Sequence, residues 1–165
     1  TIPNSRLLIH NKLITDAGVT GRLRGLFEAF GVDMDRLDFY PAIPNHLSRY
    51  HQIDIALDTF PYNGATTSCE ALWMGVPVLS LVGNSAVSRM GVSILKSIDL
   101  DDWLADSEQN YIELAKQHSA DLLKLARLRS TLRNRLIDSD LCDEDRFAQD
   151  FTECVKQMLR ESNIL

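Results

Sequence analysis

The sequence predicts an α/β fold: a parallel sheet with helices on both faces, followed by a helical C-terminal tail. Short apolar runs alternate with segments whose apolar residues recur at helical spacing. The connections between them are short, which favours parallel strands joined through helices. After Asp101 only the helical spacing remains. We therefore expect a single lobe over residues 1–165 that is mainly helical over residues 107–165.

The first third of the chain contains two expected strands. Ser5–Asn11 is a short apolar run bounded by polar residues, which is typical of a strand. Residues 18–30 repeat apolar positions at helical spacing, and Gly31 then supplies a helix stop. Leu37–Ile43 is the second strand, and residues 46–51 favour a short helix.

In the middle of the chain, expected strands and helices continue to alternate. Ile53–Asp58 is apolar enough to be a strand buried on both faces. The next helix is expected to start with Thr66 or Thr67 as its cap and to end before Gly75. Trp73 is expected in the core because it follows Leu72 on this helix. The remaining expected elements are a strand at residues 76–82 and helices at 85–97, 107–116, 120–137 and 143–161.

Composition limits the classes of partner. The net charge of -6 and pI near 5.1 argue against a nucleic-acid partner, which requires a basic surface. No run approaches the roughly 18 apolar residues of a membrane span, so no membrane partner is expected. The three cysteines fit neither a metal motif nor a disulfide framework. We expect reduced thiols in a cytoplasmic protein, and the start at Thr1 suggests a piece of a longer one.

The turn Asn63–Thr67 is the strongest candidate for a binding site. It precedes a helix, so its hydroxyls and free N–H groups suit an anion such as a phosphate. The alternative is a threonine cap with nothing bound. Glu70 has two readings that spacing does not separate: the capping-box partner of Thr67, or an acceptor for ribose hydroxyls. Asp58 is expected to fix the turn. No standard dinucleotide fingerprint, P-loop or metal motif occurs.

The stretch DIALDTFPYNGATTSCEALWMGVPVLSL, followed by GNSAVSRMGVSIL, resembles the signature of the protein O-linked N-acetylglucosamine transferases. The likeness is to their bacterial tetratricopeptide-containing relatives in particular. It implies the C-terminal, Rossmann-like lobe of a glycosyltransferase-B architecture. Such a lobe binds the nucleotide of a UDP-sugar, and its partners are a protein acceptor and the N-terminal lobe of the same polypeptide.

The resemblance assigns roles in the turn and its helix. Thr66 and Thr67 match the diphosphate-binding pair of the family, and Glu70 matches a ribose ligand that is usually Asp. Tyr62 falls near the sugar. Asn63, Gly64 and Ala65 complete the turn. Some members have His where this chain has Ala65, so one contact to the diphosphate or the sugar is missing or replaced.

A second set of positions precedes this signature. His46 and Arg49 match residues near the uracil and ribose, and Ala42 fits a backbone contact to the base. A Lys near the base in some members has no clear counterpart, and Asn45 is the nearest candidate. The alignment needs a gap here.

The implied reaction is an inverting transfer of N-acetylglucosamine, or another hexose, from UDP to protein side chains. No metal or other cofactor is expected, because the threonine pair and helix N–H groups take over charge stabilisation. The catalytic residues are expected mainly in the N-terminal lobe, which lies outside this chain, so the piece alone is expected to be inactive. Two alternatives remain: a non-catalytic nucleotide-binding or interaction module, and a UDP-sugar epimerase.

Overall fold

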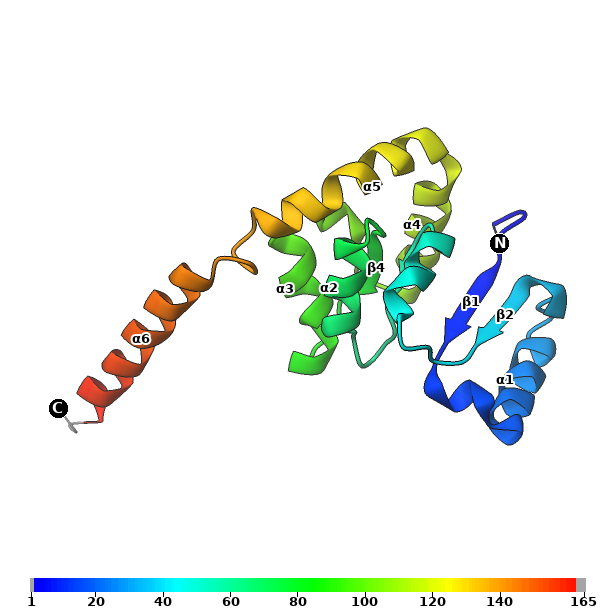
Figure 1. Cartoon of the computed structure of the whole chain (residues 1–165), viewed down its shortest axis with the longest axis horizontal. Coiled ribbons are helices and arrows are strands. Elements are labelled where there is room, and N and C mark those ends of the chain that lie inside the picture. Colours follow the sequence, from blue (N-terminus) through cyan, green and yellow to red (C-terminus); the bar gives the residue numbers. More distant parts are fainter. Residues whose placement is uncertain (1, 163–165) are drawn as a thin grey trace. The chain divides into compact units, whose positions relative to one another are not determined.

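A computed structural model describes residues 2–162 of the chain. It divides into two compact units, the first ending at Ile53 and the second beginning at Asp54. Each unit contains parallel strands and helices, which confirms the predicted α/β class (Figure 1). The single lobe over residues 1–165 stays a prediction.

The first unit is built on one pair of parallel strands. β1 (Leu7–His10) and β2 (Leu37–Tyr40) pair in register from Leu7 opposite Leu37 to His10 opposite Tyr40. The crossover between them runs through α1 (Ala17–Ala29), which Asp16 caps by accepting a hydrogen bond from the Val19 N–H at 2.9 Å. The unit also contains the 3-10 helices η1 (Lys12–Thr15), η2 (Met34–Arg36) and η3 (His46–Gln52).

The second unit contains a three-stranded parallel sheet in the order β3-β4-β5. Its strands are β3 (Ala56–Leu57), β4 (Val78–Leu81) and β5 (Leu104–Ala105). Its helices are α2 (Thr66–Trp73), η4 (Ala86–Ser88), α3 (Met90–Lys96), η5 (Asp101–Trp103), α4 (Glu108–Ala120), α5 (Leu122–Ile137) and α6 (Glu144–Glu161).

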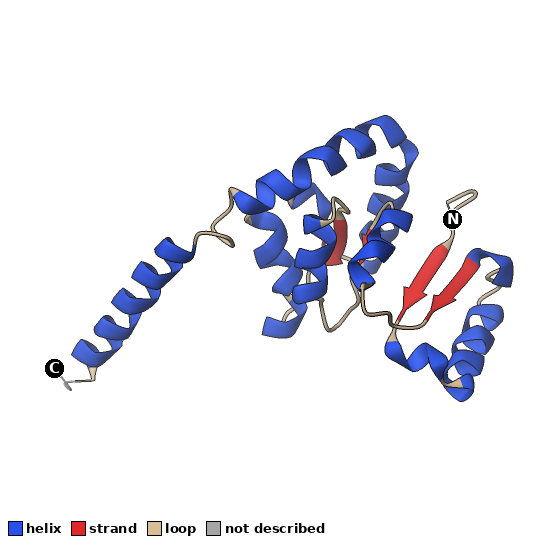
Figure 2. Ribbon diagram, viewed as in Figure 1, coloured by secondary structure: helices blue, strands red, loops and turns tan. Residues whose placement is uncertain are grey.

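The layers of the second unit follow from its connections. Two successive right-handed crossovers in one direction place α2 and α3 on the same face of the sheet, where they pack on each other and on β4. α4 comes after the last strand and packs on β4 and β5 (Figure 2). The core between these elements contains Leu72, Leu79, Leu95, Leu132 and Trp103, each at most 2% exposed.

Two helices end where glycine predicts an end. Gly31 and Gly75 have φ of 71° and 74°, a left-handed region that glycine adopts without steric cost. After α2, the Gly75 N–H donates to the Leu72 carbonyl at 3.0 Å and the Val76 N–H to the Ala71 carbonyl at 2.8 Å. This pair of bonds satisfies the last carbonyls of the helix, and the same pattern follows α1.

Several sequence expectations differ from the structure. The strands form two separate sheets, and β5 was missed because a two-residue strand leaves no apolar run to detect. The third strand is shorter than Ile53–Asp58, and Leu57 is 49% exposed rather than buried on both faces. Trp73 is 41% exposed, with Arg133 at 5.2 Å over its ring, and so lies outside the core.

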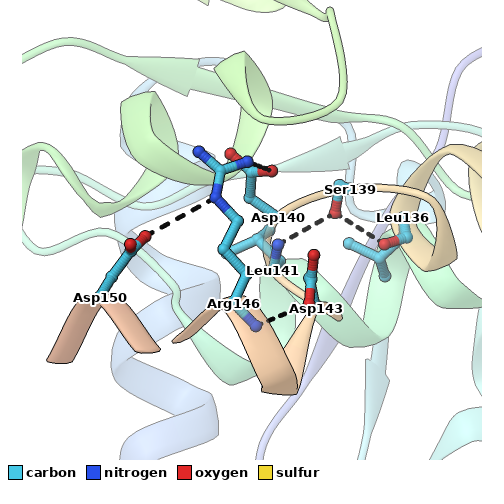
Figure 3. Close-up of polar contacts among 7 residues, drawn as sticks. All are labelled: Leu136, Ser139, Asp140, Leu141, Asp143, Arg146 and Asp150. Carbon is cyan, nitrogen blue, oxygen red and sulfur yellow. Dashed lines mark hydrogen bonds and ion pairs between the residues drawn. The ribbon is translucent and has the colours of Figure 1, made fainter. Parts of the chain in front are cut away.

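The tail helix α6 is fixed at its start by a polar junction (Figure 3). Asp143 caps the helix by accepting from the Arg146 N–H at 2.9 Å. The Arg146 guanidinium reaches back to the Asp140 carboxylate at 2.6 Å. Buried Ser139 donates its hydroxyl to the Leu136 carbonyl at the end of α5. No helix among the described residues is both long and apolar enough to cross a membrane.

An ion pair gives the first unit a dependence on pH. The Arg6 guanidinium hydrogen-bonds the Asp38 carboxylate at 2.7 Å and lowers the pKa of Asp38 below its ordinary value of 3.8. A lowered pKa adds stability above the ordinary value, and this stability is lost as pH falls through the folded-state pKa. We expect wild type to exceed Asp38→Asn slightly in thermal unfolding midpoint at pH 7, with a smaller difference at pH 3. An equal difference at both pH values would contradict this.

Candidate functional site

The candidate site is the connection between β3 and α2. It contains a cis Phe60–Pro61 bond and is held by hydrogen bonds to its own backbone. The Thr59 hydroxyl donates to the Tyr62 carbonyl at 2.8 Å, and the Asn63 side-chain amide donates to the Thr59 carbonyl at 3.0 Å. Asn63 is 1% exposed. The turn therefore has a fixed shape at the carboxyl end of β3, the edge where open α/β sheets bind ligands.

Asp58 anchors this turn, as the sequence suggested. Its carboxylate accepts from the Gly64 N–H at 2.7 Å and from the Ser80 hydroxyl at 2.6 Å. Its backbone carbonyl accepts from the Tyr111 hydroxyl at 3.0 Å. Burial raises the pKa of Asp58 although the Gly64 and Ser80 donors favour the ionised form, and burial also raises the pKa of Tyr111. Asp58 thus joins three elements: its carboxylate contacts the turn and the central strand, and its backbone carbonyl contacts α4.

The start of α2 is open. Its N-cap is Ala65, which has no side-chain acceptor for the first N–H groups. In contrast, the side chain of an Asp or a Ser caps each of the helices α1, α4, α5 and α6. The expected cap at Thr66 or Thr67 was therefore wrong, because both threonines are the first residues of the helix proper. Without a cap, the positive end of the helix is available to an anion.

The predicted contact residues surround this helix start. The side chains of Thr66, Thr67 and Tyr62 are exposed. Glu70 is half-buried one turn further along α2. Because Thr67 is not the N-cap, Glu70 is not its capping-box partner, which removes one of the two readings given to this carboxylate.

Gly64 fits closely against the helix start. A Cβ atom at this position would lie 2.5 Å from the Thr67 hydroxyl oxygen and 2.8 Å from that of Ser68. The Ser68 hydroxyl in turn donates to the Gly64 carbonyl at 3.1 Å. The position therefore requires glycine so that the hydroxyl groups of the first turn keep their places.

A second loop, Gly83–Arg89, lies beside the turn. The Asn63 N–H donates to the Val87 carbonyl at 3.0 Å and ties the two together. Gly83 packs against the Ser88 side chain, which leaves no room for a Cβ. A mainly apolar pocket of about 350 Å³ opens between them, and its lining residues are Phe60, Pro61, Leu81, Val82, Gly83, Asn84, Ser85 and Ser88.

The remaining predicted residues lie in the first unit, after β2. Ala42 is exposed in the loop, and His46 and Arg49 are half-buried in η3. The Arg49 guanidinium lies 4.1 Å from the centre of the Tyr40 ring at the end of β2. Its Nε is buried and has no hydrogen-bond partner among residues 2–162. Both predicted sets thus occupy carboxyl ends of parallel strands, each within its own unit.

Sequence reasoning missed two residues of the site, Ser80 and Tyr111. A serine inside the apolar strand VPVLSLV was a detectable signal, because a polar side chain buried in a sheet needs a partner. Tyr111 gave no such signal on α4. Among the described residues, no group of three His, Cys, Asp or Glu side chains is placed to hold a metal ion.

Comparisons with known proteins identify relatives of this chain. The model of the family described as "Glycosyl transferase family 41" matches residues 2–151. A relative from Petunia hybrida, "Probable UDP-N-acetylglucosamine--peptide N-acetylglucosaminyltransferase SPINDLY", is 38% identical over 162 residues. A "UDP-N-acetylglucosamine--peptide N-acetylglucosaminyltransferase" from Caenorhabditis elegans is 29% identical over 130 residues, covering 78% of this chain and 11% of its own length.

A solved structure extends the comparison to three dimensions. A mutant O-GlcNAc transferase of Thermobaculum terrenum matches with a TM-score of 0.90 and 36% sequence identity. The match covers 96% of this chain and 31% of that chain. The match to the Petunia relative covers 96% of this chain and 17% of the relative's length. The chain therefore spans less than a third of either protein.

Proposed function

The chain belongs to glycosyl transferase family 41, and we propose that it is the UDP-sugar-binding lobe of an enzyme that glycosylates proteins. Its fold is that of the C-terminal lobe of a glycosyltransferase-B enzyme. The proposed sugar is N-acetylglucosamine or another hexose, moved from UDP to a protein side chain. The N-terminal lobe of such an enzyme would supply the opposite wall of the active site.

One observation carries the proposal: an uncapped helix start beside a turn that is rigidly held. Thr66 and Thr67 are exposed residues there, and Ala65 provides no side-chain cap for the first N–H groups of α2. A diphosphate offers the negative oxygens that such a site accepts. We assign the diphosphate to these donors, the ribose to Glu70, and the sugar to the side of Tyr62.

The same donors suit the reaction. The acceptor hydroxyl oxygen attacks the anomeric carbon from the face opposite UDP, and the carbon–oxygen bond to the diphosphate breaks. The electron pair leaves with UDP, and the hydroxyl proton passes to a base that we place in the N-terminal lobe. Negative charge grows on the leaving diphosphate, and donors held at the start of α2 stabilise it. We therefore expect no metal requirement.

Within the first unit, we propose contacts to the uracil and the ribose. Ala42 would meet the uracil through its backbone, and His46 and Arg49 would lie beside the uracil and ribose. The unpartnered Arg49 Nε supports this assignment, because a buried charged donor without a partner is costly unless a ligand satisfies it. The family match gives no support to the epimerase alternative or to a non-catalytic module.

The test is a calorimetric titration with UDP. The double variant Thr66→Ala/Thr67→Ala should bind UDP at least about tenfold more weakly, because two hydroxyl donors to a charged group are lost while the N–H donors remain. The control Thr131→Ala/Thr152→Ala removes two exposed threonine hydroxyls that bond only within their own helices. It should leave the affinity unchanged. Equal affinity of all three proteins would refute the diphosphate assignment.

A further inference from the structure

We propose that Asp58 is a positioning residue for sugar-nucleotide binding: its carboxylate holds Gly64, and thereby the open start of α2, in the arrangement that receives the diphosphate. This inference rests on the proposed function. It assigns a role in the reaction to a buried residue that has no direct part in the ligand contacts proposed above.

The geometry supports a role in positioning. Asp58 is 8% exposed, and its two carboxylate oxygens are divided between two elements. One accepts from the Gly64 N–H at 2.7 Å, on the turn, and the other from the Ser80 hydroxyl at 2.6 Å, on β4. Ser80 is fully buried in the central strand. The turn is thus joined through one side chain to the buried central strand of the sheet.

The packing around this carboxylate leaves it little freedom. A Cβ atom on Gly91 of α3 would collide with Ser80 and lie 3.0 Å from the Asp58 carboxylate. On the other side of the sheet, Tyr111 donates its hydroxyl to the Asp58 carbonyl. Helices on both faces therefore fix Asp58, and Asp58 fixes Gly64. A short hydrogen bond to an ionised acceptor is well suited to this task.

The charge of Asp58 has the opposite effect on the ligand. A carboxylate directly behind an anion site repels a diphosphate, so removing the charge alone should strengthen UDP binding. Loss of positioning should weaken UDP binding instead. The two roles of the residue therefore predict changes of opposite sign, which makes the inference testable by affinity alone.

The experiment measures the affinities of UDP and uridine for the protein and takes their ratio as the contribution of the diphosphate. Asp58→Ala leaves the Gly64 N–H without its acceptor, and we expect this ratio to fall about tenfold. Asp58→Asn keeps an amide oxygen for Gly64 and removes the charge, and we expect a ratio at least as high as that of wild type. Uridine affinity should stay within about twofold in both variants, because only the diphosphate depends on the start of α2.

Asp54→Asn is the matched control. Asp54 lies before the opposite end of β3, and its exposed carboxylate pairs with Arg129 at 2.8 Å. The same loss of charge there should leave the ratio unchanged. If Asp58→Ala does not fold, Ser80→Ala takes its place, because it frees one oxygen of the Asp58 carboxylate and should lower the ratio in the same direction.

Each outcome decides between explanations. A ratio that is unchanged or raised in Asp58→Ala, or in Ser80→Ala where that variant replaces it, overturns the positioning role. An equal fall with Asp58→Asn and Asp58→Ala would also overturn it, since the hydrogen-bond acceptor would not then matter. Failure of the proposed function is seen separately: wild type would bind UDP no better than uridine, or not at all.

Discussion

Replacing Trp103 with alanine is expected to lower the free energy of unfolding of the second unit by about 3–5 kcal/mol, the range for large aromatic side chains in cores. Trp103 is 2% exposed and is the largest fully buried side chain of the described residues. Its ring stacks on His118 of α4 with centroids 3.9 Å apart. The substitution would leave a cavity beneath α4 and remove this contact. Urea unfolding followed by circular dichroism measures the change.

The matched control for this prediction is Trp73→Ala. Trp73 is 41% exposed, and the Arg133 guanidinium lies 5.2 Å from the centre of its ring. Because part of this ring already contacts water, its removal should cost clearly less stability than the removal of Trp103. Equal losses in the two variants would contradict the assignment of Trp103 to the core and of Trp73 to the surface.

The two tryptophans also show what the sequence could predict of the fold. Periodicity and glycine stops placed nearly every helix, because α-helical spacing and the ends at Gly31 and Gly75 are local properties. Whether Trp73 faces the core depends on which side of α2 meets α5, and a single sequence does not contain that information. β5 was missed for the same reason, since two residues become a strand only by pairing with β4.

In the site as well, the sequence predicts local features but not the contacts between distant parts of the chain. The residue types of the turn Asn63–Thr67 and its place before a helix predict an anion site, and this stays a prediction. The predicted cap, Thr66 or Thr67, lies one or two positions after the observed N-cap, Ala65. A helix that starts at any of these three positions has nearly the same local sequence pattern. The partners of Asp58 were not predictable in full: Ser80 and Tyr111 lie 22 and 53 positions away along the chain.

Gly64→Val is expected to lower UDP affinity by about 100-fold, the largest effect on binding that we expect from a single substitution. An added Cβ would already crowd the hydroxyl oxygens of Thr67 and Ser68 at 2.5 and 2.8 Å. Alanine can be accommodated by rotation of these two short side chains. Valine branches at Cβ and also approaches the Asp58 carboxylate, which lies 3.4 Å from the Cβ position. The turn must then move away from the start of α2.

The control Gly25→Val separates a local effect from a general one. Gly25 lies in α1 of the first unit, where an added Cβ would meet no other atom within 4 Å. It should cost little stability, because valine has a better helix propensity than glycine, and it should not alter UDP affinity. A calorimetric titration of both variants with UDP and uridine gives the result. If Gly64→Val weakens uridine and UDP binding equally, the displacement of the turn does not affect the contacts to the diphosphate, and the prediction is contradicted. If it weakens UDP alone, the ligand depends on the close contact of Gly64 with the first turn of α2.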